Sequence, residues 1–320
     1  MLLLGSGLFA QEKPAQEKPA QEKPAKEEPV TIFRAEVSLV KVDFEVVDRG
    51  GGAAPDFTKD DFVVFDENQP QPIVHFERQS VPLDLLLLLD ISGSMRRSLE
   101  DVAAASRAAL AQLHPGDRVA LMLFSRETKV AQPFTEDFSA TQYKILDSIY
   151  KQNLGNGTLI NESLIAAAGY MKQEPVRGRR AILIVTDNEG LNYKSPDAEV
   201  VRTMFAADTV LNAIVVRKGP RPPAVRSTGY TNPDFAPPDV YRISQQTGGA
   251  AVDGIGKVGD VFQRMVESIR SRYFLQYAAP SAELEGKFRH IRVELSPAAQ
   301  RLHPAAVIHA REGYYASDTH

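Results

Sequence analysis

Residues 85–95 read LLLLLDISGSM, in which five leucines run into an aspartate and then two serines separated by a glycine. The apolar run has the length of a strand and is far too short for a membrane-spanning helix, which takes ~20 apolar residues. A continuous apolar run of this length is typical of a parallel strand buried on both faces. We therefore predict a central strand that delivers Asp90, Ser92 and Ser94 to one edge of a sheet.

Composition excludes several classes of protein. The 320 residues are 43% hydrophobic, which is enough for one large domain or two ordinary ones. The net charge of −4 argues against a nucleic-acid-binding protein and against a polybasic membrane anchor. Cysteine is absent, which excludes disulfides, thiolate zinc sites and cysteine nucleophiles but leaves oxygen-ligand metal sites open. A monomer is assumed.

The N-terminus has the pattern of export and tethering. Residues 1–10 resemble the apolar core and cleavage end of a secretory signal peptide, although no basic residue precedes the core. A truncated signal peptide is therefore expected, with a misread start codon as the alternative, and the predicted location is extracytoplasmic, either periplasmic or secreted. Residues 11–29 carry tandem QEKPA repeats and are predicted to form a disordered linker.

The rest of the chain predicts a central α/β domain with β-rich flanks. Alternation of apolar and polar residues, as in LVKVDFEVVD, predicts strands in residues 30–81 and again in residues 274–317. We expect the two ends to pair into one small β-sandwich or a shared sheet that brackets the central domain. In residues 82–273 strands alternate with helical patterns, which predicts a doubly wound, mostly parallel, Rossmann-like sheet. The first helix is expected to start with Ser98 as its capping residue.

Two groups of arginines are predicted to be solvated. Arg177, Arg179 and Arg180 precede a predicted strand and are expected to form an exposed turn. Arg96 and Arg97 directly follow the serine motif, where a solvated pair is expected and attraction of an acidic partner is the alternative. The proline-rich residues 217–239 are predicted to form an irregular insertion.

Oxygen-bearing side chains follow three of the predicted strands. Asp90, Ser92 and Ser94 follow the first, Thr158 lies in the loop GNGTL, and Asp187 ends RAILIVTD. The carboxyl ends of parallel strands meet at one edge of a sheet. Hydroxyls and carboxylates without His or Cys suit a hard cation such as Mg²⁺. The alternative is that Asp90 and Ser92 cap a turn and a helix, and that Thr158 is an ordinary loop residue.

The order of these residues resembles the von Willebrand factor A domain and its metal-ion-dependent adhesion site. The flanking motifs DFVVFDE, TGGAAV, YFLQY and REGYYA resemble those of bacterial proteins related to this family. The resemblance implies Mg²⁺, with Mn²⁺ as a substitute, and a protein partner that completes the coordination with an Asp or Glu carboxylate. It implies no catalytic residue and a function in adhesion or assembly. The implied metal ligands are Asp90, Ser92, Ser94, Thr158 and Asp187.

One departure from the family pattern concerns the last ligand. Family members usually have glycine directly after the final aspartate, whereas here TDNEG delays it to Gly190. Glu189 then lies near the metal site, where it either approaches the metal or repels a partner's carboxylate. A structural envelope module with a vestigial metal site therefore remains an alternative function.

An Mg²⁺-dependent phosphotransferase of the haloacid dehalogenase type is the enzymatic alternative. Such enzymes use Asp-x-Asp after an apolar strand, with the second acid as general acid and base. Here Ser92 occupies that position, and an unperturbed hydroxyl cannot perform this role at neutral pH. The sequence also lacks the phosphate-binding GxxxxGK[ST] and the nucleophile motif GxSxG. We therefore expect a protein that is not an enzyme.

Overall fold

A computed structural model describes residues 39–48, 56–78, 80–151, 154–155, 157–190, 195–216, 238–254, 257–279 and 286–316. They all belong to one compact unit, Val37–His320. The predicted signal peptide (1–10), the repeat linker (11–29) and nearly all of the insertion (217–239) lie outside the described residues. None of the described helices is long and apolar enough to cross a membrane.

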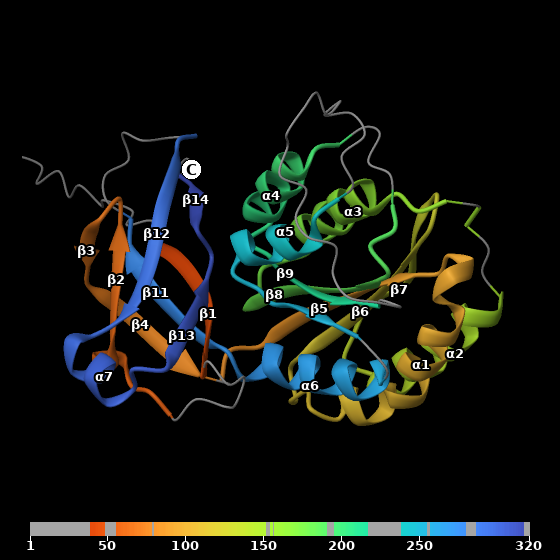
Figure 1. The fold of residues 1–320 in the computed structure, drawn as a ribbon, viewed down its shortest axis with the longest axis horizontal. Helices are drawn as coiled ribbons and strands as arrows, with labels where there is room; N and C mark the ends of the chain where they lie inside the picture. The colour runs from red at the N-terminus through yellow and green to blue at the C-terminus, as the bar shows by residue number, and fades with distance from the viewer. Residues whose placement is uncertain are drawn as a thin grey trace, which may run out of the picture. The chain divides into compact units, whose positions relative to one another are not determined.

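The centre of this unit is a six-stranded sheet in the order β10-β9-β8-β5-β6-β7 (Figure 1). Neighbouring strands are parallel except for β7, which pairs antiparallel with β6 at one edge. The edge strand β7 was not predicted, because its mixed sequence TKVAQPFT has no strict alternation. The strands are β5 (Leu83–Asp90), β6 (Arg118–Phe124), β7 (Thr128–Thr135), β8 (Arg179–Thr186), β9 (Val210–Val215) and β10 (Ala251–Asp253).

Strand β5 lies between two layers of helices, as predicted from its leucine run. All of its residues are buried. Leu85, Leu87 and Leu89 pack into one apolar cluster, whereas Leu86 and Leu88 pack into a second cluster on the other face. The first layer consists of α1 (Arg96–Leu110), α2 (Phe138–Lys151) and α6 (Val258–Ser271), and the second of α3 (Ile160–Gln173), α4 (Asp197–Ala206) and α5 (Val240–Thr247).

The N-cap of helix α1 lies three residues earlier than predicted. The 3-10 turn η2 (Gly93–Met95) runs directly into α1, so the helix starts at Arg96 and its N-cap is Met95. Ser98 is therefore buried in the first turn and is not the capping residue. Arg96 and Arg97 are exposed, as predicted.

The two ends of the chain form a pair of antiparallel sheets, in the orders β13-β1-β11-β4 and β14-β12-β2-β3. Both sheets combine N-terminal and C-terminal strands around one apolar cluster, so the predicted pairing and the fold class are confirmed. The domain boundaries stay predictions. The elements are β1 (Leu39–Asp48), η1 (Lys59–Asp61), β2 (Phe62–Asp66), β3 (Gln69–Gln71), β4 (Ile73–Arg78), β11 (Tyr273–Ala278), β12 (Phe288–Leu295), α7 (Pro297–Leu302), β13 (Ala306–Ala310) and β14 (Gly313–Tyr315).

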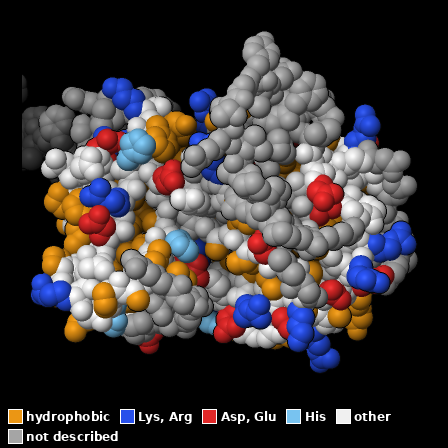
Figure 2. Space-filling view, in the orientation of Figure 1, with side chains coloured by type: hydrophobic (Ala, Val, Ile, Leu, Met, Phe, Trp, Pro, Cys, Tyr) orange, Lys and Arg blue, Asp and Glu red, His pale blue; other side chains and the backbone are white. Residues whose placement is uncertain are grey.

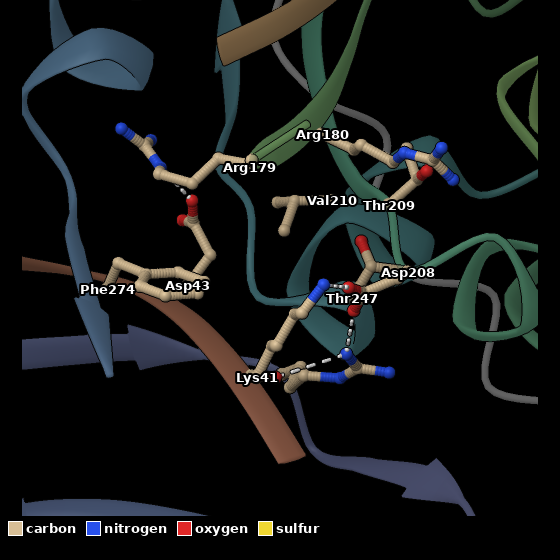
Figure 3. A pocket seen from close by; sticks show the side chains of 11 residues that line it. Lys41, Asp43, Arg179, Arg180, Asp208, Thr209, Val210, Thr247 and Phe274 are labelled. Atoms are coloured by element: carbon tan, nitrogen blue, oxygen red, sulfur yellow. Dashed lines mark hydrogen bonds and ion pairs between the residues drawn. The ribbon is translucent and has the colours of Figure 1, made fainter. Parts of the chain in front are cut away.

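The prediction of an exposed turn at Arg179 and Arg180 was wrong. Both residues open strand β8 and are buried, whereas Arg177 is exposed as expected. Arg179 donates to Asp43 of β1 (Figure 3) and to the carbonyl oxygen of Arg270 at 3.1 Å. Arg272, directly after α6, donates to the same aspartate. The partner Asp43 lies far away in the sequence, so local pattern alone did not reveal this burial.

Mutation of Asp43 tests this junction. Asp43→Asn leaves two buried guanidinium groups without their shared counter-charge, so we expect a loss of about 3–5 kcal/mol in the free energy of unfolding. Urea denaturation measures the loss. Asp60→Asn, which changes an exposed acid of η1, is the matched control. A loss at Asp43 no larger than the control would contradict the proposed role of the ion pair.

Mutation of Leu87 tests the burial of β5. Leu87 is 0% exposed, and Leu87→Ala is expected to lower the free energy of unfolding by about 2–5 kcal/mol because it leaves a cavity. The control is Leu302→Ala on α7, because Leu302 is 76% exposed. Its effect in the same urea titration should stay within about 0.5 kcal/mol.

Acidic and basic side chains alternate over the face shown in Figure 2, with no field of a single sign among the residues coloured there. This pattern agrees with the small net charge of −4. Specific binding on this protein is therefore expected to depend on local clusters of side chains.

Candidate functional site

The predicted site residues occur where β5 and β8 end. Asp90 is the last residue of β5 and is fully buried, and Ser92 and Ser94 follow it in the turn that leads into α1. Asp187 directly follows β8, the parallel neighbour of β5. Because the two strands are parallel and adjacent, their carboxyl ends meet at the same edge of the sheet.

Four of the five predicted residues form a continuous series of contacts. The Ser92 N–H donates to Asp90 Oδ1 at 3.0 Å, and the Ser92 and Ser94 Oγ atoms are 3.2 Å apart. The Ser94 hydroxyl donates to Asp187 Oδ2 at 2.5 Å. The structure thus brings Asp90, Ser92, Ser94 and Asp187 together, although Asp187 is 93 residues away from Ser94 in the sequence.

Thr158 is placed on the neighbouring loop. The adjacent Leu159 N–H donates to the carbonyl oxygen of Ser125 at 2.9 Å, which fixes this loop at the end of β6. A Cβ added to Gly190 would lie 2.9 Å from the Thr158 carbonyl oxygen, so the loops carrying Asp187 and Thr158 are closely packed. The Thr158 side chain is half-buried, and its hydroxyl makes no hydrogen bond to a described residue.

Thr186 is a site residue that the sequence reasoning missed. Its buried hydroxyl donates to Asp90 Oδ2 at 2.8 Å and accepts from the Asn188 N–H at 3.1 Å. It therefore connects the carboxylate at the end of β5 to the loop after β8. The available signal was a hydroxyl residue at the end of an otherwise apolar strand, directly before a candidate ligand.

The longer TDNEG loop still keeps Asp187 at the site. Asn188 takes up the turn with φ +58°, a left-handed conformation that asparagine tolerates better than most residues. The Glu189 N–H donates to Asp187 Oδ1 at 3.0 Å, while the Glu189 side chain is exposed. Gly190 then packs closely against Ile160 at the start of α3. Residues 188 and 189 therefore extend the loop outward and leave the aspartate in place.

The electrostatics of the site disfavour a bare Asp90 carboxylate. The pKa of Asp90 is raised from 3.8 to about 6, mainly by burial and to a smaller extent by the nearby Asp187 charge. Hydrogen bonds from Ser92 and Thr186 oppose this increase in pKa. Among the described residues, no group of three or more His, Cys, Asp or Glu side chains is arranged to hold a metal ion. The candidate site is instead built from the carboxylates of Asp90 and Asp187 and the neutral hydroxyls of Ser92, Ser94 and Thr158. We call these five residues the oxygen site.

A polar cavity lies where β8 and β9 begin, at the end of these strands opposite to the candidate site (Figure 3). Its volume of about 20 Å³ is enough for roughly one water molecule. The charged groups that line it are mostly paired: Arg311 with Asp208 at 2.7 Å, and Arg179 with Asp43. We therefore interpret this cavity as part of the structural junction and not as a ligand site.

Comparison with known proteins finds a family match over the part of the chain that carries the candidate site. Residues 85–190 match the family model of the von Willebrand factor type A domain. The chain contains a von Willebrand factor A domain. The matched span runs from the leucines of β5 to Gly190, so it includes all five predicted ligands and the TDNEG loop. Domains of this family are protein-interaction modules, which indicates an interaction or adhesion-type role here.

Individual relatives of this von Willebrand factor A domain are distant. A 115-residue segment is 29% identical to an uncharacterised protein of Borreliella burgdorferi and covers 34% of this chain and 33% of that protein. The chain therefore matches about a third of that relative's length. A solved von Willebrand factor type A structure from Catenulispora acidiphila is 11% identical with a TM-score of 0.47, covering 88% of this chain and 75% of that one. An aerotolerance-related membrane protein from Bacteroides fragilis is 18% identical with a TM-score of 0.44, covering 58% and 98%.

The raised pKa of Asp90 predicts how stability depends on pH. A carboxyl group with a higher pKa in the folded state binds its proton more tightly there, so its ionisation destabilises the fold as pH rises from about 4 through about 6. Asp90→Asn removes this charge. In metal-free buffer the variant should gain about 3 kcal/mol over the wild type at pH 7.5 and little at pH 4.

Urea denaturation in EDTA at the two pH values measures this difference. The control is Asp101→Asn, which removes the charge of an exposed acid of α1. An Asp90→Asn variant that is equally or less stable than the wild type at pH 7.5 would argue against the predicted cost of ionising Asp90.

Proposed function

We propose that Asp90, Ser92, Ser94, Thr158 and Asp187 bind Mg²⁺, with Mn²⁺ as a substitute, and that this site captures an Asp or Glu side chain of a protein partner. The observation that carries the proposal is the series of contacts from Asp90 through both serines to Asp187. The same oxygens that now bond to one another are of the kind that a hard cation prefers.

The charges of the site support a divalent cation. Asp90 is buried and close to a second carboxylate, so its ionised form is unfavourable without a positive charge nearby. Two carboxylates offset the charge of a dication, whereas the hydroxyls of Ser92, Ser94 and Thr158 contribute oxygen atoms without adding negative charge. When bound, the cation would supply an attraction for an outside carboxylate.

Each residue would have its own position at the metal site. Asp90, oriented by the Thr186 hydroxyl, forms the base of the site, and Asp187 approaches from the end of β8. The serine hydroxyls are exposed or half-buried, so this side of the site is accessible to a partner. We propose no chemical step, because Ser92 stands where a phosphotransferase would need its second acid. We also propose an extracytoplasmic location, which rests on the sequence of residues 1–10.

A structural module with a vestigial metal site is the second candidate function. The observation that favours it is the direct hydrogen bond between Ser94 and Asp187, which satisfies both groups without a metal. The exposed Glu189 beside the site favours it too, because a negative charge there would repel a partner's carboxylate.

Thermal unfolding with and without metal separates the two candidates. A ligand that binds only the folded state stabilises it by about 2.7 kcal/mol at a concentration of 100 times Kd. We therefore expect millimolar Mg²⁺ or Mn²⁺ to raise the Tm of the wild type by roughly 5–10 °C. Asp90→Ala should abolish the rise, because it removes the central carboxylate.

Glu100→Ala, on the exposed side of α1, is the control variant and should keep the full metal response. A wild-type Tm that does not change with metal would favour the vestigial site. Metal-dependent phosphatase turnover that disappears in Asp90→Asn would instead support the enzymatic alternative.

A further inference from the structure

Three exposed arginines lie on the elements that carry the oxygen site. Arg96 and Arg97 are the first two residues of α1, directly after the turn that carries Ser92 and Ser94. Arg126 follows the end of β6 and is exposed as well. None of the three forms an ion pair with a described residue, in contrast to the half-buried Arg118 and the buried Arg289.

The end of β6 places Arg126 between the first two loops of the site. The Phe124 carbonyl accepts from the Ile91 N–H at 2.8 Å, and the Ser125 carbonyl accepts from the Leu159 N–H at 2.9 Å. The last residue of β6 and the residue after it thus hold the loop after Asp90 and the loop containing Thr158. Arg126 comes next, and its side chain lies against Gly155: a Cβ added there would be 3.3 Å from Arg126 Cβ.

Arg96 and Arg97 stand where a helix disfavours positive charge. The N-terminal end of an α-helix carries a partial positive charge, which favours acidic side chains in the first turn and disfavours basic ones. Helix α1 has two arginines and no acid in its first turn. The start of the helix therefore disfavours both cations, and a negative group from outside would offset this effect.

We propose that Arg96, Arg97 and Arg126, the arginine rim, bind acidic side chains that flank the carboxylate held at the oxygen site. The partner is then a protein segment with several Asp or Glu residues close together. This inference rests on the proposed function for the central carboxylate only, since the arginines require no metal. Glu127 and Glu189 are exposed on the same loops and disfavour a ligand with continuous negative charge, such as nucleic acid.

Two fluorescent twelve-residue peptides in a Gly/Ser background test the rim with the full chain. One carries a single central Asp, and the other adds a Glu on each side at a spacing of three residues. Fluorescence anisotropy in Mg²⁺ at low salt should give about tenfold tighter binding for the three-acid peptide, as expected for a few exposed charge pairs. Because exposed pairs are screened, the difference should shrink towards 0.5 M NaCl.

Matched variants test whether the arginine rim causes the preference for the three-acid peptide. The triple variant Arg96→Ala, Arg97→Ala and Arg126→Ala should bind both peptides with the affinity that the wild type has for the single-acid peptide. The control triple variant removes the same charge at exposed sites far from the loops: Arg107→Ala, Lys172→Ala and Arg301→Ala. It should keep the tenfold preference. Glu189→Gln should strengthen binding of the three-acid peptide.

Each result decides the proposal. Binding of the three-acid peptide that persists in EDTA, without binding of the single-acid peptide, would support the rim and count against the metal site. Equal affinity for both peptides, a preference unchanged in the rim variant, or no binding of either peptide under any condition would overturn the rim. Single-stranded DNA of twelve nucleotides that binds as tightly as the three-acid peptide would overturn the choice of an acidic protein segment.

Discussion

Burial of β5 on both faces is the constraint on which the position of the oxygen site depends. Alternate leucines of this strand pack into opposite helical layers, so a shift of one residue would exchange the two sets of contacts. The register with β6 and β8 is therefore well defined, and with it the position of Asp90 at the sheet edge. The same packing removes Asp90 from water and raises its pKa. The packing that stabilises the fold therefore also makes ionisation of the Asp90 carboxylate unfavourable.

Ion pairs connect the β-rich flanks to the central sheet, in addition to the continuous backbone. Helix α6 ends at Ser271 and β11 begins at Tyr273, so the two parts share an uninterrupted backbone. Between these elements, Arg272 donates to Asp43, which also accepts from Arg179 of β8. A single half-buried carboxylate, paired with two buried arginines, therefore connects β1, β8 and the end of α6. Because an unpaired guanidinium would be costly at this depth, the pairing favours one arrangement of these elements.

The edge of the sheet that carries the oxygen site differs from this junction, because its polar groups are only partly paired within the chain. Ser92, Ser94 and Asp187 bond to one another, but the neighbouring arginines have no acidic partner among the described residues. The TDNEG loop adds Glu189 without displacing Asp187, because Asn188 adopts the left-handed turn. A surface that combines hydroxyl and carboxylate oxygens with unpaired cations suits the carboxylate-bearing partner that we propose. At the Asp43 junction, by contrast, arginines and a carboxylate pair with one another within the chain.

The sequence by itself determined the central strand, the order of the main helices and strands, the pairing of the two chain ends and the places where oxygen side chains emerge. These features depend on local periodicity, which reports which face of an element is apolar. Tertiary structure alone decided which polar groups bond directly to one another. It joined Ser94 to Asp187, brought Thr186 against Asp90, and buried Arg179 beside Asp43, contacts that are 93, 96 and 136 residues apart in the sequence. A polar residue carries no local signal of its partner, because the partner is selected only when distant strands come side by side.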